Sequence, residues 1–443
     1  MVKVLRFSVW ILFLSFSAGL ASGTTTPRNT TPRNTTPGKT KRVAAVRHVA
    51  PARHAAPPRH VAAIRHAAPV RRVAPVRHVL PVRHVAPVRH VAASSPLPYL
   101  GVIQGGPWTR PTFADSTDGD RTDGEDPDVR RAAVEALGPY NGAVVVVDPA
   151  TGRVLSMVNQ KLVLSSGFQP CSTIKVSVAL AALSEKVIEP ETKLRVVGTS
   201  MDLTYALAHS NNYFFAGLGL KLGFEKFRAY AQQFGYGEKA GLDIPGEQAG
   251  SFPAAPPHNG GVAMLTSFGE EISQTPLQLA ALIAAMANGG TLHYLQYPRT
   301  PLELSQFVPR VKRRLPIESL ISGVRPGMRA AVEYGTARRA RQQEPIAGKT
   351  GTCSEDHTHL GWFGAFNDVG GQKLVVVVLL TGGRPAIGPV AAGIAGDIYR
   401  RLNQQNYFTA WRPSIPMANL GWPLVPHPPI AGPYATTQRP TGR

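Results

Sequence analysis

The chain has 443 residues, enough by length for two or three domains, and it carries a formal net charge of +21. Seventeen of its 48 lysines and arginines precede Asp115, the first acidic residue, so most of the excess charge lies in an N-terminal tail. This distribution excludes a uniformly basic folded body and separates the chain into parts with different physical character.

The first 23 residues have the pattern of a secretory signal peptide. Lys3 and Arg6 precede an apolar run from Phe7 to Ala21 that ends in small residues. The run is about 15 residues long, shorter than the roughly 20 that span a bilayer comfortably. Residues 1–23 are therefore predicted to be a cleaved signal, with a short membrane anchor as the alternative. Either one places the body outside the cytoplasm, in the periplasm or facing the cell wall.

Residues 24–95 form a low-complexity tail with Arg-His pairs recurring every six residues. The pairs begin at Arg47, Arg53, Arg59, Arg65, Arg77, Arg83 and Arg89, and most repeats contain proline. Because proline interrupts both helices and sheet ladders, a disordered tail is predicted. Its expected partner is an anionic wall polymer or a lipid surface, and no nucleic acid is expected outside the cytoplasm. A solvated spacer without a dedicated partner is the alternative.

Two further segments are predicted to lack a packed core. Residues 96–137 are expected to be a linker, in which seven of the fourteen residues from Asp115 to Asp128 are acidic. Their spacing does not match the ligand pattern of a calcium loop, so a solvated linker is expected. The chain becomes proline-rich again near its end, and residues 406–443 are predicted to form a loosely ordered tail.

The remaining residues, 138–405, are predicted to form one domain of about 270 residues, enough for a two-lobed body with a sizeable core. Val176–Leu183 is apolar and alanine-rich, and it predicts a buried helix. Leu374–Leu380 predicts a buried strand. The other predicted helices are Ala206–Leu222, Glu225–Phe234, Leu277–Met286 and Val390–Leu402.

Ser172-Thr173-Ile174-Lys175 stands at the head of the predicted buried helix. Positions three apart share one helix face, so the Ser172 hydroxyl and the Lys175 amine should meet on the first turn. A hydroxyl needs an adjacent base to become a nucleophile, and burial lowers the pKa of a lysine toward that use. By itself this S-x-x-K spacing is a weak signal, because a capping serine followed by a snorkelling lysine has the same pattern.

Two more motifs follow in order. Ser210-Asn211-Asn212 lies between two helical patterns, and Lys349-Thr350-Gly351-Thr352 lies in a strand-like stretch. S-x-x-K, S-x-N and K-T-G together are the motif set of the penicillin-interacting acyltransferases. Connecting stretches such as Thr275–Ala280 and Gly335-Thr336-Ala337 are similar to landmarks of the same family. Over roughly residues 138–405, the chain resembles the transpeptidase domain of penicillin-binding proteins.

The resemblance implies an α/β (α+β) fold of the serine β-lactamase and penicillin-binding protein type. A central antiparallel sheet is flanked by helices, and a helical lobe lies beside it. The implied activity is that of a D,D-transpeptidase, which acts on the D-Ala-D-Ala end of peptidoglycan stem peptides through an acyl-serine and is acylated by β-lactams. The implied scheme needs no metal and no organic cofactor.

The implied catalytic residues are Ser172, Lys175, Ser210 and Lys349. Ser172 attacks the substrate carbonyl, Lys175 accepts its proton, and Ser210 relays a proton to the leaving D-alanine. The backbone N–H groups of Ser172 and Thr352 form the oxyanion hole.

The implied substrate contacts come from the second and third motifs. Asn212 hydrogen-bonds the substrate amide or the donor side chain. Lys349 fixes the substrate carboxylate electrostatically, helped by Thr350 or Thr352. Gly351 suits a strand that a substrate backbone must approach closely.

Three other functions stay open at this point. A D,D-carboxypeptidase passes the same acyl group to water. A class D-like β-lactamase shares Pro170, Ser172, Thr173 and Lys175 but carries a hydrophobic residue at the position of Asn212. A non-catalytic β-lactam sensor or wall-binding protein is the third, although such a protein has no need for an intact lysine base.

The chain has two cysteines, Cys171 and Cys353, and each adjoins one of the two implied oxyanion donors. If both donors reach one oxygen, the cysteine Cα atoms lie within roughly 6–10 Å, against the about 4.4–6.8 Å that a disulfide requires. An oxidising compartment favours the bond. A disulfide and a pair of free thiols are both compatible with this spacing.

Overall fold

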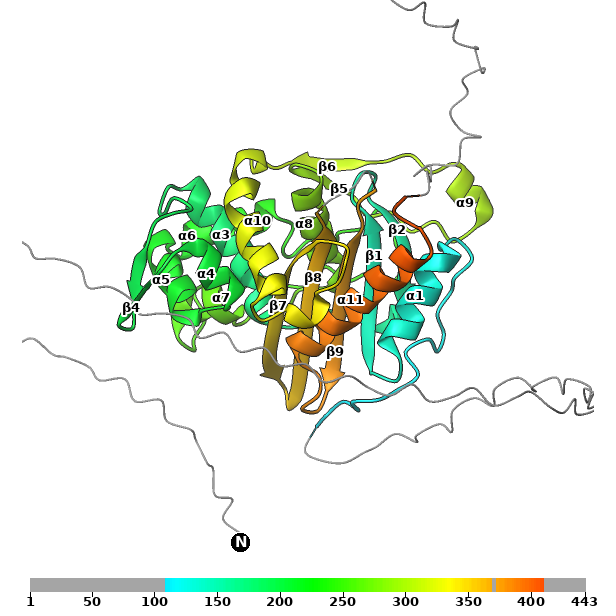
Figure 1. Ribbon diagram of the computed structural model, residues 1–443, viewed down its shortest axis with the longest axis horizontal. Helices are drawn as coiled ribbons and strands as arrows, with labels where there is room; N and C mark the ends of the chain where they lie inside the picture. The colour runs from blue at the N-terminus through cyan, green and yellow to red at the C-terminus, as the bar shows by residue number, and fades with distance from the viewer. Residues whose placement is uncertain (1–107, 369–371, 410–443) are drawn as a thin grey trace, which may run out of the picture. The chain divides into compact units, whose positions relative to one another are not determined.

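The structure, a computed structural model, describes residues 108–368 and 372–409 (Figure 1). The predicted signal, the basic tail and most of the C-terminal tail lie outside the described residues. The described part is built on a five-stranded sheet in the order β2-β1-β9-β8-β7, in which all neighbours are antiparallel. The strands are β1 (Gly142–Asp148), β2 (Arg153–Val158), β7 (Ile346–Glu355), β8 (Thr358–Asn367) and β9 (Val375–Gly382).

The central strands are buried on both faces, which explains their continuous runs of valine. Val145 and Val147 of β1 belong to one core, whereas Val144 and Val146 belong to the other. Successive side chains of a strand point to opposite faces, so β-branched residues at every position fill both cores. The antiparallel sheet with helices on both sides confirms the fold class implied by the resemblance.

Three helices cover the two faces of the sheet. One face packs against α8 (Pro276–Ala287), and the other against α1 (Pro127–Leu137) and α11 (Gly388–Gln404), as Figure 1 shows. With 17 residues, α11 is the longest described helix. None of the helices in residues 108–368 and 372–409 is both long and apolar enough to cross a membrane.

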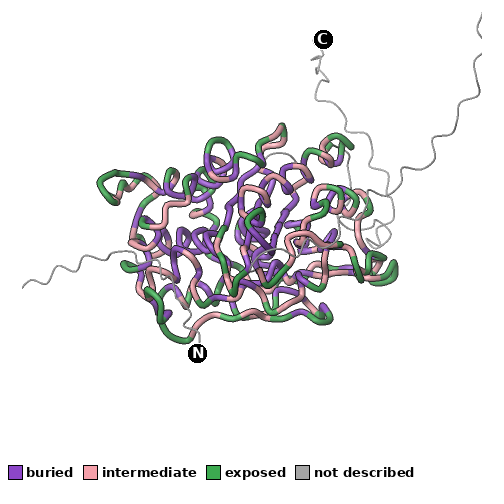
Figure 2. The backbone as a smooth tube through the Cα atoms, turned by 90° about the horizontal axis from the view of Figure 1, so that it is seen from below, coloured by how far each residue is buried: buried purple, intermediate pink, exposed green. Residues whose placement is uncertain are grey.

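A helical lobe lies beside the edge strand β7 (Figure 1). Its helices are α3 (Ile174–Ser184), α4 (Leu203–Ala208), α5 (Asn212–Leu222), α6 (Phe224–Gln233) and α7 (Gly261–Phe268). Between the lobe and β7 lies α10 (Glu318–Glu333), which packs on α4, α3 and β7. In Figure 2 the interior of the described part is largely buried and its loops are exposed.

Shorter elements complete the described part. They are the helices α2 (Gln160–Val163) and α9 (Pro301–Ser305), the 3-10 turns η1 (Cys171–Thr173) and η2 (Arg338–Ala340), and the strand pairs β3 (Leu194–Val196) with β4 (Thr199–Met201) and β5 (Thr291–His293) with β6 (Val311–Arg314).

The predicted buried helix is present as α3, in which every residue from Ile174 to Leu183 is buried. The predicted continuous helix Ala206–Leu222 is wrong, because the chain breaks between α4 and α5. At the break Ser210 has φ +55°, in the left-handed region. The side chain of Asn211 accepts a hydrogen bond from Phe214 N at 2.9 Å and caps α5. Short polar side chains that bond to the backbone compete with a continuous helix in this way.

The expected solvated linker is also wrong in its acidic part. The side chains of Asp120 and Glu125 are only 2% and 1% exposed, and both pair with Arg130. Glu125 also accepts a hydrogen bond from Met157 N at 2.8 Å, on the free edge of β2. A buried strand edge must satisfy its N–H groups, and these carboxylates do so. The folded domain therefore begins before residue 138.

The C-terminal end of the domain extends slightly beyond residue 405, its predicted boundary. Tyr407 is 1% exposed, packs in the core beneath α11, and reaches the Asp126 carboxylate at 3.2 Å. Residues 406–409 thus belong to the domain and not to the predicted tail, because burial of Tyr407 and Phe408 removes apolar ring surface from water.

Candidate active site

The first motif forms a turn followed by a fully buried helix. Ser172 lies in η1, is 8% exposed, and leads directly into α3. Cys171 before it has φ +51°, a left-handed conformation that costs a non-glycine residue energy. Strained residues of this kind are found at sites where a side chain must be presented in one direction.

Lys175 lies one helical turn after Ser172, and its side chain is completely buried. Its Nζ is 2.8 Å from Ser172 Oγ and 2.5 Å from Asn212 Oδ1. It also donates to Ser210 O at 2.9 Å and lies 3.2 Å from Ser210 Oγ. Burial, followed by the nearby charge of Lys349, holds the pKa of Lys175 well below its usual range. A neutral amine beside a serine hydroxyl is able to accept its proton.

Lys349 enters the same centre from β7. It is 1% exposed, and its Nζ lies 2.9 Å from Ser210 Oγ and 3.0 Å from Thr350 O. Burial lowers the pKa of Lys349 to about 7. The third motif thus meets the second inside the protein, and the amine is bonded to a hydroxyl and a carbonyl rather than open to solvent.

The four side chains form one continuous hydrogen-bonded chain. It runs from Ser172 Oγ to Lys175 Nζ, on to Ser210 Oγ, and ends at Lys349 Nζ. All of these side chains come from the three motifs. The motifs meet because the chain breaks between α4 and α5 and because β7 lies at the edge of the sheet. Such a chain is able to carry a proton away from one hydroxyl and deliver it at another.

Gly351 packs against the turn formed by Pro170 and Thr173. A Cβ added there would lie 2.9 Å from Pro170 O and 3.2 Å from Thr173 Cγ2. The missing side chain therefore lets β7 pack directly against the turn that precedes α3. This packing accounts for the glycine by itself, and a role of Gly351 in admitting a substrate backbone stays a prediction.

Thr350 and Thr352 are each bonded to a residue outside the motifs. The hydroxyl of Thr350 lies 2.7 Å from that of Thr336, and Thr352 Oγ1 accepts a hydrogen bond from Gly388 N at 2.8 Å, in the first turn of α11. Thr352 is exposed, whereas Thr350 is 4% exposed. No role was predicted for Thr336, although its Gly-Thr-Ala stretch is similar to a family landmark, and no sequence signal marks Gly388.

The family model of the penicillin binding protein transpeptidase domain matches residues 142–400, more than half of the chain. The chain belongs to the penicillin-binding protein transpeptidase family. The resemblance drawn from the three motifs is confirmed.

Two curated relatives and one solved structure show how far the similarity extends. Stage V sporulation protein D of Bacillus subtilis (strain 168) is 30% identical over 311 residues, or 60% of this chain and 48% of the relative. Peptidoglycan D,D-transpeptidase PbpA of Mycolicibacterium smegmatis is 26% identical over 348 residues, or 62% of this chain and 70% of the relative. A crystal structure of Pseudomonas aeruginosa PBP2 in complex with WCK 5153 matches with a TM-score of 0.56 at 25% identity, covering 64% of this chain and 76% of that one. The chain spans about half the length of the sporulation protein.

In the transpeptidase domain, the turn that contains Ser172 is joined to the end of β7. Cys171 and Cys353 form a disulfide with Cα atoms 5.5 Å apart. Two residues earlier in the turn, Gln169 N donates to Glu355 Oε2 at 3.1 Å, and Gln169 O accepts from Trp362 Nε1 at 2.9 Å. These contacts hold the left-handed turn before Ser172 against the strand of the third motif.

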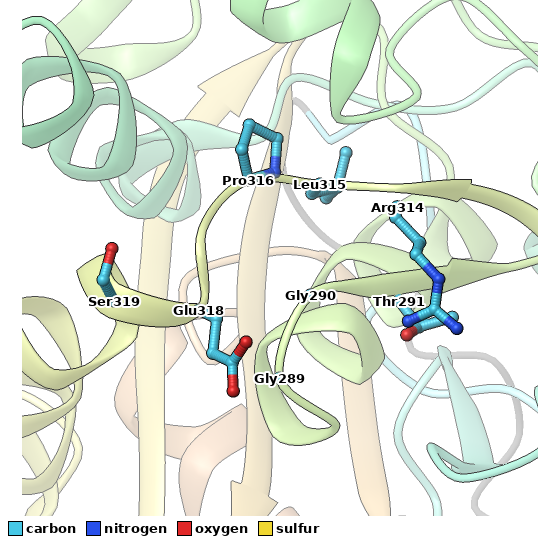
Figure 3. Close-up of a pocket in the computed structure, with 8 residues that line it drawn as sticks. All are labelled: Gly289, Gly290, Thr291, Arg314, Leu315, Pro316, Glu318 and Ser319. Atoms are coloured by element: carbon cyan, nitrogen blue, oxygen red, sulfur yellow. The ribbon is translucent and has the colours of Figure 1, made fainter.

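A surface pocket of the transpeptidase domain, about 460 Å³ in volume, lies away from this centre. Figure 3 shows it between the α8–β5 turn and the segment from β6 to α10, with Gly289, Arg314 and Glu318 among its lining residues. None of the residues of the three motifs lines this pocket. Within the described ranges, no group of three His, Cys, Asp or Glu residues is placed to hold a metal ion.

Proposed function

We propose that this chain is a serine D,D-transpeptidase of peptidoglycan that β-lactams acylate covalently. The observation that carries the proposal is the hydrogen-bonded chain Ser172–Lys175–Ser210–Lys349, with Lys175 Nζ 2.8 Å from Ser172 Oγ. Membership of the transpeptidase family supports the same reaction. The proposed substrate is the D-Ala-D-Ala end of a stem peptide.

In the first half-reaction, Ser172 Oγ attacks the carbonyl of the penultimate D-alanine, and neutral Lys175 accepts the hydroxyl proton. The N–H groups of Ser172 and Thr352 stabilise the oxyanion. The C–N bond then breaks, and the proton passes through Ser210 to the departing D-alanine amine. The acyl group remains on Ser172 as an ester.

In the second half-reaction, an amine of a neighbouring stem peptide attacks this ester. The amide forms, the bond to Ser172 Oγ breaks, and the proton of the amine returns to Ser172. Transfer to water instead gives a D,D-carboxypeptidase, which uses the same first half-reaction and is the second candidate.

The substrate carboxylate is proposed to contact Thr352, one of the two residues expected to help Lys349 bind it. Lys349 is 1% exposed and already bonded to Ser210 and Thr350 O, so its charge acts at short range and not by direct contact. The hydroxyl of Thr352 is exposed and accepts a hydrogen bond from Gly388 N, which leaves its own proton free to donate to the carboxylate. Asn212 keeps a role in orienting Lys175 and the substrate amide.

A β-lactamase fits this arrangement poorly. Every hydrogen-bond partner of Lys175 and Lys349 among the described residues is a hydroxyl, an amide or a backbone carbonyl. Rapid hydrolysis of a β-lactam needs a dedicated base that activates water against the acyl-enzyme, and none of these groups is a carboxylate. A pure sensor has no use for a neutral lysine beside the serine.

The decisive experiment is covalent labelling with a fluorescent penicillin. We expect labelling of the full chain at Ser172, identified by peptide mapping, and no labelling of Ser172→Ala. The control is Ser165→Ala, a change in a loop serine outside the motifs. Labelling of Ser172→Ala at the normal rate places the nucleophile elsewhere and ends the proposal.

The localisation and the basic tail belong to the same proposal. Residues 1–23 direct or anchor the chain outside the cytoplasm, and residues 24–95 bind an anionic wall polymer or lipid surface. Binding of the full chain to isolated wall should weaken as salt rises, because exposed charges are screened within about 10 Å at 0.1 M salt. If deletion of residues 41–93 leaves binding unchanged, the tail is a spacer.

A further inference from the structure

Three exposed aromatic rings lie in a row beside the second motif. The ring centroids of Tyr205 and His209 are 4.2 Å apart, and those of His209 and Tyr334 are 5.9 Å apart. Tyr205 and Tyr334 are each 49% exposed, and His209 is exposed as well. Contiguous aromatic surface left open to solvent marks sites of interaction. We refer to Tyr205, His209 and Tyr334 as the aromatic rim.

The rim is attached to the catalytic centre through short backbone contacts. His209 directly precedes Ser210, the proposed proton relay. Tyr334 precedes Gly335, which packs so closely on α4 that an added Cβ would lie 2.1 Å from Ala208 O. The end of α10 and the end of α4 therefore meet without an intervening side chain, and this contact places the rings of the rim side by side.

The rim also adjoins the strand of the third motif. Thr336, two residues after Tyr334, donates from its N–H to Ala208 O at 3.0 Å, and its hydroxyl lies 2.7 Å from that of Thr350. The rim thus borders the side of the centre at which Ser210 and Thr350 lie. In the proposed function this is the side of the leaving D-alanine.

The chemistry of the second half-reaction identifies what must occupy that side. The leaving amine departs past Ser210, and attack by an acceptor amine on the acyl-enzyme is the reverse of that departure. Forward and reverse steps use the same groups and the same path. The acceptor must therefore approach across the space next to Ser210, which the rim borders.

A positive charge that fits the same ligand follows Tyr334 in the chain. Arg338 in η2 is exposed and forms no ion pair with a carboxylate in the part of the chain that the structure describes, whereas the side chain of Arg339 faces Gly393 of α11. A stem peptide carries carboxylates as well as an amine, and guanidinium groups bind carboxylates with paired hydrogen bonds.

We propose that the aromatic rim, together with Arg338 four residues after Tyr334, is the docking surface for the acceptor stem peptide. The inference rests on the proposed function and adds to it a second substrate site, distinct from the contacts that hold the donor. It predicts that the rim governs how the acyl group is divided between an amine and water, and that acylation itself does not depend on it.

The test measures this division in the full chain. The donor is a thioester analogue of an acyl-D-alanine. The acceptors are a stem tripeptide with a free side-chain amine and, in parallel, free D-alanine, which is too small to span the rim. Tyr205→Ala and Tyr334→Ala remove one ring each, whereas Tyr205→Phe and Tyr334→Phe keep it. The matched control is Tyr140→Ala, since Tyr140 also belongs to a ring pair, with Phe113 at 5.5 Å, but lies next to β1, three strands from β7.

We expect the alanine variants to lower the ratio of transfer to hydrolysis with the tripeptide by about 5- to 30-fold, the worth of one aromatic anchor. The ratio with D-alanine, and the rate of labelling by fluorescent penicillin, should stay within about two-fold of wild type. The phenylalanine variants and Tyr140→Ala should match wild type in every measurement.

An unchanged ratio with the tripeptide, or an equal fall with both acceptors, overturns the docking surface while leaving the transpeptidase proposal intact. Exclusive hydrolysis by the wild type, with acylation normal, overturns it as well and favours the carboxypeptidase. Failure of the wild type to form any acyl-enzyme is a different result, because it removes the proposed function on which the inference rests.

Discussion

Lys175 and Lys349 share one hydroxyl group, since their Nζ atoms lie 3.2 Å and 2.9 Å from Ser210 Oγ. Both lysines are buried, and two full positive charges around one hydroxyl repel each other strongly in a low-dielectric interior. The pKa of Lys175 is accordingly held well below its usual range, first by burial and then by Lys349. Burial and the neighbouring charge thus both favour the unprotonated amine of Lys175 beside Ser172.

The first prediction concerns this base. Lys175→Ala should reduce the second-order rate constant for acylation by benzylpenicillin about 10²- to 10⁴-fold, the usual worth of a positioned general base. Stopped-flow or gel labelling measures the rate. Lys161→Ala is the matched control, because Lys161 is a 70% exposed lysine that pairs with Asp118. A near-normal rate in Lys175→Ala means that another group takes the proton.

The second prediction links Lys349 to the pH dependence of stability. Its pKa is about 7 in the folded protein against 10.5 for an ordinary lysine. Between these two values the unfolded chain binds more protons, so the residue makes the free energy of unfolding rise with pH, by up to about 1.4 kcal/mol per pH unit. Below about pH 7 both states are protonated, and the residue adds no slope.

Urea denaturation of the wild type and of Lys349→Met at pH 7, 8 and 9 checks this slope. The difference in the free energy of unfolding between the two proteins should move in favour of the wild type as pH rises. Parallel curves across this range would show that Lys349 keeps an ordinary pKa in the folded state.

The third prediction concerns the disulfide. Mass spectrometry of the non-reduced, alkylated protein should find one linked peptide pair that contains Cys171 and Cys353. Replacing both residues with alanine should lower the free energy of unfolding by about 2–5 kcal/mol, since the bond closes a long loop. Acylation should also slow, because the left-handed turn before Ser172 loses its covalent tether to β7. Two alkylated cysteines in protein taken from an oxidising compartment would contradict the bond.

The fourth prediction concerns the lifetime of the acyl-enzyme. Since the lysines of the site have no carboxylate partner in the described residues, the penicilloyl-enzyme should persist for minutes or longer. Intact-protein mass spectrometry after removal of free penicillin follows its decay. Rapid, sustained turnover of nitrocefin would instead support the β-lactamase.

Local sequence was sufficient for the features that depend on spacing along one element. Ser172 and Lys175 meet because residues three apart share a helix face, and α3 is buried because its residues are apolar all round. The apolar run of β9 predicts a buried strand for the same reason. These features need no knowledge of distant parts of the chain.

Tertiary structure alone decided the features that depend on two distant segments meeting. Glu125 appeared to be one of many solvated acids, and it is buried because the free edge of β2 requires acceptors for its N–H groups. The small size of Gly351 matters because the turn at Pro170 packs onto β7. Lys349 is enclosed because the break at Ser210 turns a hydroxyl toward it. In each case the partner lies far away in sequence, and burial, which sets both the geometry and the pKa, exists only once the two segments have packed together.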